Sequence, residues 1–231
     1  NNPYVFPVLG INTVGTGRIM AISTAAKALS EGQFGQFPLY AFTDEGVWAL
    51  EVSSTGSYSA RQPITRDVIL ANTEPLQMDS AVLFATDRGI MLISGSQTQC
   101  ITDVINSKEP FDVLQLPGMA KLHSMLGHSA DTCLPTAPFL EFIAECGMLY
   151  DYVHQRVIVY NPKYTYAYVY SLKSKEWGMM YSTIEAGINS YPEALAVDHD
   201  GALLNFSSMD GEPTKGLFVT RPLKLETPDV L

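Results

Sequence analysis

Positive charge, cysteine and long apolar runs are all scarce in this chain, and each scarcity excludes a class of protein. Lysine and arginine number 14 against 24 acidic residues, a net charge of −10, which argues against tight nucleic-acid binding. The three cysteines (Cys100, Cys133, Cys146) form no Cys-x-x-Cys pair, so neither a disulfide framework nor a zinc site is indicated. We expect each to be a small buried apolar residue. No run of about 18 apolar residues occurs, so we expect no membrane span.

Apolar side chains, by contrast, are plentiful. They make up 46% of the 231 residues while charged residues make up 16%, a balance typical of a well-filled globular core. No segment has the composition of a flexible linker, so we predict a single domain over residues 1–231. The chain starts at Asn1 without a methionine or signal segment, and we expect it to be a piece of a longer protein.

One short pattern occurs twice. Residues 39–52 (LYAFTDEGVWALEV) and 82–94 (VLFATDRGIMLIS) each lead an apolar run into Thr-Asp-x-Gly and out into another apolar run. Their glycines, Gly46 and Gly89, lie 43 positions apart. Looser copies occur at 195–206 and, without the glycine, at 157–170. A repeat of roughly 40–50 residues built on one β-hairpin predicts the blades of a β-propeller.

The repeat divides the chain into about four blades of four antiparallel strands, an all-β fold. The expected strands are 18–23, 39–42, 47–52 and 58–62, then 68–70 or 76–78, 82–85, 90–94 and 99–104, then 148–153, 156–160, 167–172 and 177–181, with blade four over about 185–224. Their middle strands are apolar on both faces, as expected for sheets sandwiched between neighbours. Two arrangements stay open, a closed four-bladed disc and an arc of a larger propeller.

Between about 112 and 147 the apolar spacing changes from two residues to nearly 3.6, which predicts a helical insertion. A helix start is indicated at Thr136 and Pro138 and its stop at Gly147. The first helical face is a candidate contact surface, although it would equally well cover the blade edges: Met119, Leu122, Met125 and Leu126.

Two groups of residues invite a metal interpretation, and we favour a structural one for both. The run Asp198–Gly201, with acidic residues downstream, has carboxylates near a turn glycine but lacks the full calcium-loop spacing, so a hairpin turn is the favoured interpretation. The second group is His123, His128, Asp131 and Cys133, whose histidines do not share a helix face. We therefore predict no metal and no cofactor, and we predict that the chain is not an enzyme. Phe34 and Phe37 either anchor their loop or form a contact surface.

Several stretches of the sequence resemble proteins of a known source. Residues 28–52 and 58–67, with the closing 220–231, look like proteins of phages and prophages of Bacteroides-type gut bacteria. The opening 1–7 (NNPYVFP) is similar to a strand of tail nozzle and tail-tube proteins of short-tailed phages. The resemblance implies a virion structural protein whose propeller lines or buttresses a DNA channel. It also implies that the family's pattern continues beyond Leu231.

Three functions follow as hypotheses. The first is a non-enzymatic tail component that associates with its own copies and with other tail proteins, located in the virion or in the bacterial cytoplasm before assembly. The second is a propeller that binds glycans or peptides, and the third is a hydrolase or lyase on the same fold. For the first, the candidate interface residues are Met119, Leu122, Met125, Leu126, Phe34 and Phe37.

Overall fold

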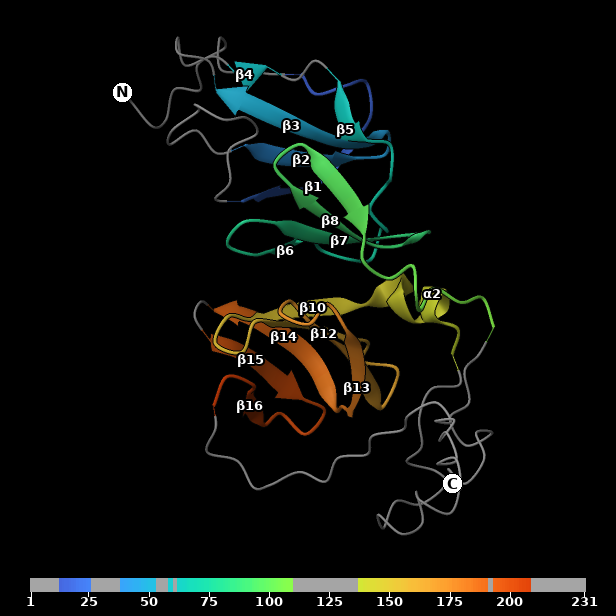
Figure 1. Cartoon of the computed structure of the whole chain (residues 1–231), viewed down its shortest axis with the longest axis vertical. Helices are drawn as coiled ribbons and strands as arrows, with labels where there is room; N and C mark the ends of the chain where they lie inside the picture. Colours follow the sequence, from blue (N-terminus) through green and yellow to red (C-terminus); the bar gives the residue numbers. More distant parts are fainter. Residues whose placement is uncertain are drawn as a thin grey trace, which may run out of the picture.

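The structure, a computed structural model, describes residues 13–25, 38–52, 58–59, 62–109, 137–190 and 193–208. Within these residues the strands form antiparallel sheets of five, four, four and three strands in chain order. The sheets are arranged as the four blades of a β-propeller (Figure 1). The predicted all-β propeller fold is confirmed.

Each blade follows the chain from its innermost strand outward. Blade one has β1 (Ile19–Thr24), β2 (Leu39–Thr43), β3 (Gly46–Val52), β4 (Tyr58–Ser59) and β5 (Pro63–Thr65), the last pairing with β3. Blade two has β6 (Leu76–Gln77), β7 (Val82–Thr86), β8 (Gly89–Ser94) and β9 (Gln97–Cys100). Blade three has β10 (Gly147–Asp151), β11 (Arg156–Tyr160), β12 (Tyr166–Ser171) and β13 (Trp177–Tyr181). The described part of blade four has β14 (Ile184–Ser190), β15 (Glu193–Asp198) and β16 (Leu203–Asn205).

Most predicted strands lie within a residue or two of the observed ones. The outermost strand of blade two is wrong, and β5 of blade one was not predicted. The innermost strand of blade two is the second of the two predicted alternatives. The outermost strand, predicted over 99–104, instead spans Gln97–Cys100. Gly95 adopts a positive φ of 63° and allows a tight turn that pairs Ser94 with Gln97, so the strand starts two residues early. The chain then turns at Thr102, whose carbonyl accepts the backbone N–H of Ile105.

The helical prediction is confirmed at its C-terminal end. A short helix α2 (Phe139–Phe142) starts directly after Pro138, and a 3-10 helix η4 (Ile143–Glu145) follows before β10 starts at Gly147. Phe142 is fully buried and stacks on Tyr166 with ring centroids 4.9 Å apart. The rest of the predicted insertion, before residue 137, lies outside the described residues.

Alternation along the strands builds the core between blades. In β7 and β8, Phe84, Met91 and Ile93 pack toward blade one. Leu83 and Ile90, on the opposite face of the same sheet, pack toward blade three. Because both faces of blades two and three are covered, their middle strands carry buried apolar side chains on both faces, as the sequence predicted.

Each pair of neighbouring blades is also joined by a hydrogen bond. The Tyr40 hydroxyl of blade one donates to the Gly95 carbonyl of blade two at 2.9 Å. Trp177 of blade three donates from Nε1 to the carbonyl of Ile101, also at 2.9 Å. Between blades three and four the link is a side-chain cluster, described below. Trp177 is thus a contact between blades, and Trp48 is a buried residue of blade one.

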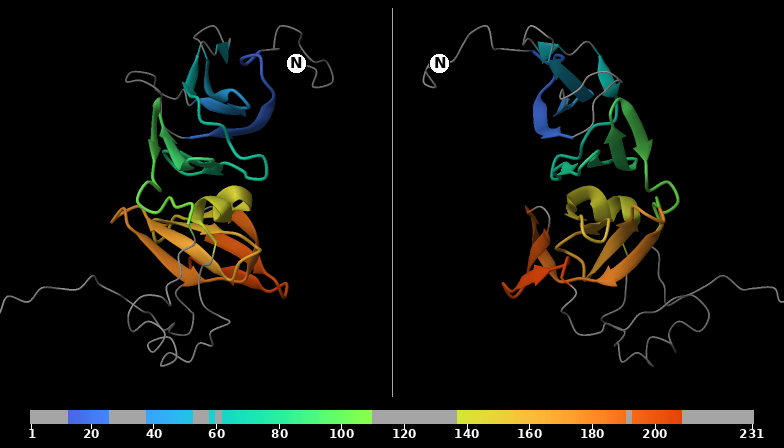
Figure 2. Two further views of the ribbon diagram at one scale, coloured as in Figure 1. Left: turned by 90° about the vertical axis from the view of Figure 1, so that its right-hand side faces the viewer. Right: turned by 60° about the vertical axis from the view of Figure 1, so that its left-hand side comes forward.

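The blades lie along an arc. The innermost strands β1, β6, β10 and β14 contact one another in that order. Figures 1 and 2 show blade one at one end of the long axis, blade two next to it, and blades three and four side by side at the other end. The outer faces of blades one and four are therefore the two ends of the arc.

Candidate functional site

The Thr-Asp-x-Gly repeat forms the same turn in blades one and two. Thr43 and Thr86 are fully buried, and each hydroxyl donates to the carbonyl of the turn glycine, at 2.9 Å to Gly46 and 2.8 Å to Gly89. Each hydroxyl also accepts a backbone N–H two residues on, at 3.2 Å. The repeated threonines and glycines therefore have a structural role in the hairpin.

Blade four makes the equivalent turn with a carboxylate. Asp198 Oδ1 accepts the backbone N–H groups of Asp200 at 3.0 Å and Ala202 at 2.7 Å, and Gly201 has a φ of +82°. The hairpin interpretation of this segment is confirmed. Over the residues that the structure describes, no group of three or more His, Cys, Asp and Glu side chains is arranged to hold a metal ion.

The other candidates from the sequence lie outside the described residues. These are the second metal candidate, His123, His128, Asp131 and Cys133, and the candidate interface, Met119, Leu122, Met125, Leu126, Phe34 and Phe37. Their roles stay predictions. Of the remaining cysteines, Cys146 is buried, and burial raises the pKa of its thiol to about 12, as expected for a small apolar core residue. Cys100 is only half-buried, so the prediction of a buried cysteine is wrong at this position, where the residue ends the outermost strand of its blade.

Within the described residues, a group of ionisable side chains around Asp151 joins blade three to blade four, and the sequence did not single it out. Asp151, at the end of β10, is fully buried. Its Oδ2 accepts from Arg156 Nε at 2.8 Å and lies 2.7 Å from His154 Nδ1. Its Oδ1 accepts from the Ser207 hydroxyl at 2.9 Å. Ser207 follows blade four, so one carboxylate holds two blades together.

Hydrogen bonding decides the charge of this carboxylate. Burial on its own raises the pKa of Asp151, but the hydrogen bonds from His154, Ser207 and Arg156 outweigh it, and the pKa is lowered. Arg156 also donates from Nη2 to the carbonyl of Phe206 at 2.7 Å. Asp151 is therefore ionised at neutral pH and clamps the blades.

The order of these groups does not suit nucleophilic catalysis. In a hydrolase triad a histidine lies between serine and aspartate and takes the serine proton. Here the aspartate lies between Ser207 and His154, and the Ser207 hydroxyl also accepts the backbone N–H of Ala194 at 3.0 Å. The cluster is equipped to hold blades together. A signal for it was present in the run 151–156 (DYVHQR), where three ionisable residues flank one hairpin.

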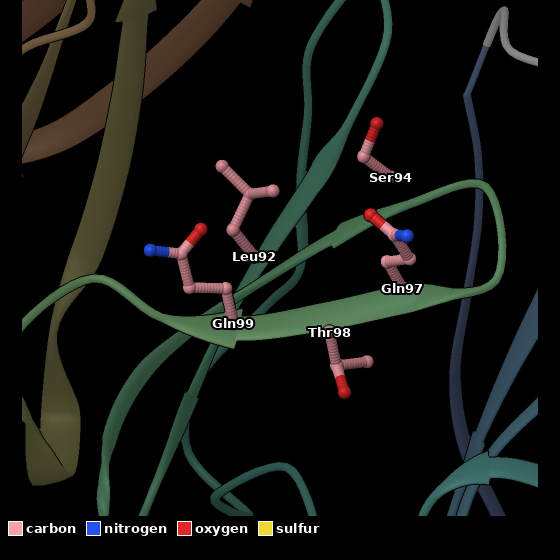
Figure 3. Close-up of a pocket in the computed structure, with 5 residues that line it drawn as sticks. All are labelled: Leu92, Ser94, Gln97, Thr98 and Gln99. Carbon is pink, nitrogen blue, oxygen red and sulfur yellow. The ribbon is translucent and has the colours of Figure 1, made fainter.

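A shallow groove of about 460 Å³ runs along the outer edge of blade two (Figure 3). Its lining is uncharged: Leu92, Ser94, Gln97, Thr98 and Gln99. Gln97 and Gln99 lie on one face of the outermost strand, β9, and Thr98 lies on the other (Figure 3). Glutamine amides both donate and accept hydrogen bonds, so this groove suits a neutral polar ligand.

The two ends of the arc carry apolar side chains in water. On β1 of blade one, Ile22 is 63% exposed and Ile19 is 49% exposed. On blade four, Leu203 is 65% exposed and Ile188 is 44% exposed. Val104 and Tyr181 are also exposed, on blades two and three, but the side chains on β1 and blade four lie on the faces turned away from the neighbouring blade, and we treat them as candidate contact surfaces. Neither end could be recognised in the sequence, where these strands look like any other blade strand.

Compared with known proteins, the chain matches no family model and no curated protein. No helix in the described part of the chain is long and apolar enough to cross a bilayer.

Proposed function

We propose that this chain is a non-enzymatic assembly protein, a nozzle-like component of a phage or prophage tail that acts through contacts with its own copies and with neighbouring tail proteins. The observation that carries the proposal is the exposed apolar surface at both ends of the arc, centred on Ile22 and Leu203. Exposed apolar groups of this kind are typical of surfaces that another protein covers.

The chemistry of the polar residues supports the same function. The side chains around the buried Asp151 hydrogen-bond between blades three and four. The hydroxyls of Thr43 and Thr86 hydrogen-bond within their own hairpin turns. The net charge of −10 suits a channel wall that lets DNA pass without retaining it. The virion origin itself rests on the resemblance of the sequence to tail proteins. The chain would then be found in the virion, and in the bacterial cytoplasm before assembly.

The test is to look for the protein in particles. Phage particles are purified from a bacterial culture that carries the gene, and the tail fraction is analysed by mass spectrometry and by electron microscopy with a labelled antibody against this chain. We expect the chain to co-purify with tail proteins in a constant ratio, with the label at the tail. Particles that lack the chain, from a strain that produces it, would refute the proposal.

A second candidate function is a propeller that binds a glycan or a peptide. The groove beside Gln97 and Gln99 favours it, because two neutral amides on one strand face can recognise hydroxyl or peptide groups. An immobilised glycan and peptide panel tests it. Binding that is lost in a variant with both Gln97→Ala and Gln99→Ala supports this second function, and a panel without binders counts against it.

A further inference from the structure

The shallow groove of blade two reaches a strand edge that is open to pairing. Within the described residues, β9 is the outermost strand of its sheet and pairs with β8 alone. Gln97 and Gln99, on one face of β9, line the groove together with Thr98, on the other face (Figure 3). Because the lining includes residues from both faces, the groove extends along the outer edge of β9.

The hydrogen-bond pattern of the hairpin shows which backbone groups point out from this edge. The Ile101 N–H donates to the Ile90 carbonyl at 3.0 Å, which continues the register of β8 with β9. In an antiparallel pair every second residue bonds across, so Gln99 and Gln97 bond to β8 and Thr98 does not. The N–H and C=O groups of Thr98 therefore point away from β8, and no described residue hydrogen-bonds to them.

The hairpin lacks the features that keep other strands away from an edge. Natural proteins commonly protect edge strands with lysine, proline or a β-bulge. Residues 89–102 contain no charged residue and no proline, and the pairing of β8 with β9 has no register shift. By contrast, the pairings of β1 with β2, of β3 with β5 and of β14 with β15 each contain a shift. The edge of β9 is therefore able to accept a further strand.

The side chains beside the edge define the ligand. Gln97 and Gln99 are exposed, and the half-buried Leu92 pairs with Gln99 across the hairpin. Because the glutamines are two residues apart on a strand, they lie about 7 Å from each other, which is also the spacing of alternate side chains in an extended peptide. Their amides donate and accept hydrogen bonds, and the lining has no charge to pair with a charged ligand. The surface therefore matches a peptide with uncharged polar side chains at alternate positions.

We propose that the groove binds an extended, uncharged peptide segment of a partner protein, which adds to β9 as a further strand. One residue of the peptide exchanges both backbone hydrogen bonds with Thr98, and its two neighbours place Gln, Asn, Ser or Thr side chains over Gln97 and Gln99. A peptide offers an N–H and a C=O at the spacing of the ladder, whereas a glycan has no such repeat. This inference rests on the binding function given above as the second candidate, and it narrows the ligand to a peptide.

Two substitutions at one position test the strand addition. The probe is a fluorescein-labelled peptide of alternating Thr and Gln with blocked ends, and fluorescence polarisation measures its binding to the whole chain. Thr98→Pro removes the N–H that points to the ligand and keeps the pairing with β8, because proline is tolerated where the N–H of an edge strand faces outward. Thr98→Val, the matched control, removes the hydroxyl and keeps the N–H.

We expect the unaltered chain and Thr98→Val to bind the probe alike, and Thr98→Pro to bind about tenfold more weakly, with unchanged circular dichroism. A second measurement leaves the protein unaltered and replaces the probe with the same peptide methylated on its backbone nitrogens, which should not bind. Equal binding by Thr98→Pro overturns the inference, and so does equal binding of the methylated peptide or an unaltered chain that does not bind the probe.

The outcome is separable from that of the second candidate function. A glycan that binds the unaltered chain and is lost in the variant with both Gln97→Ala and Gln99→Ala, while the probe peptide does not bind, would keep that function and overturn the strand addition.

Discussion

Blades one and two meet across an apolar interface, whereas blades three and four meet across one that contains a buried charge. Between the first pair, Phe42 and Phe84 pack edge to face. Between the second pair, Asp151 accepts hydrogen bonds from Arg156 on its own blade and from Ser207 beyond blade four. The same contrast holds in the turns, where threonines cap the hairpins of the first pair and Asp198 caps that of blade four.

Equivalent interfaces between the blades of a repeated fold can therefore be stabilised by different kinds of interaction. An apolar interface tolerates small shifts of one blade on the next, because dispersion contacts have little direction. A buried carboxylate with several donors holds one geometry and becomes costly when a donor is lost. Two experiments test this contrast between the interfaces, and two more compare the repeated turns of blades one and two.

The largest effect is expected in the apolar interface. Phe84 is fully buried between blades one and two, so Phe84→Ala removes its transfer free energy and leaves a cavity. We expect the free energy of unfolding to fall by about 4 kcal/mol. Urea denaturation followed by circular dichroism measures it, with Val104→Ala at an exposed site as the control. A loss below about 1 kcal/mol would mean that the interface is not tightly packed.

The second-largest loss of stability is expected at the interface of blades three and four, which contains Asp151, and its size depends on pH. Asp151→Asn leaves Arg156 without its buried counter-charge and should lower the free energy of unfolding at pH 7 by about 3 kcal/mol. The folded-state pKa of Asp151 lies below its ordinary value of 3.8. The unfolded chain therefore binds this proton first, so the stabilisation is complete above about pH 5 and is lost as the pH falls through the folded pKa.

Urea denaturation at neutral pH and in a series below pH 4 checks this prediction. The gap between the original protein and Asp151→Asn should narrow as the pH falls. A gap that stays constant across the series would show that Asp151 does not act through its charge.

The two repeated turns allow a closer comparison, because their glycines share a φ of +128° and +127° but differ in surroundings. A Cβ on Gly46 would lie 2.2 Å from the backbone carbonyl oxygen of Thr65, whereas on Gly89 it would meet the side chains of Thr102 and Asn106. Gly46→Ala should cost about 3 kcal/mol and Gly89→Ala about 2, since side chains yield more easily than backbone. Thermal unfolding of the two variants side by side decides it, and equal losses would contradict the argument from surroundings.

The smallest effect should be the same in both turns. Thr43→Val and Thr86→Val each remove one buried hydroxyl with the same donor and acceptor contacts. Each should lower the free energy of unfolding by about 1 kcal/mol. The two losses, measured by urea denaturation, should agree within about 0.5 kcal/mol. A clear difference would mean that the two copies of the sequence repeat do not contribute equally to the free energy of unfolding.

Sequence reasoning recovered the blades because the repeat is local. The hairpins of β2 with β3 and of β7 with β8 follow from apolar runs on either side of Thr-Asp-x-Gly, which needs only short-range hydrogen bonds. The outermost strand of blade two was misplaced because residues 95–100 are mostly polar. In such a run the sequence does not show that the chain turns at Gly95 or that the strand ends at Cys100. The Asp151 cluster was missed because its partner Ser207 lies 56 residues away.

The sequence by itself determined most of the strands, the repeated hairpin turns and the all-β class, because alternation and turn chemistry act between residues close along the chain. Only the tertiary structure decided which faces are covered. Ile188 and Ala196 both belong to apolar blade-four strands, yet Ala196 packs on blade three and Ile188 is left in water at the end of the arc. That distinction depends on where the neighbouring blade lies, a contact that no local pattern encodes.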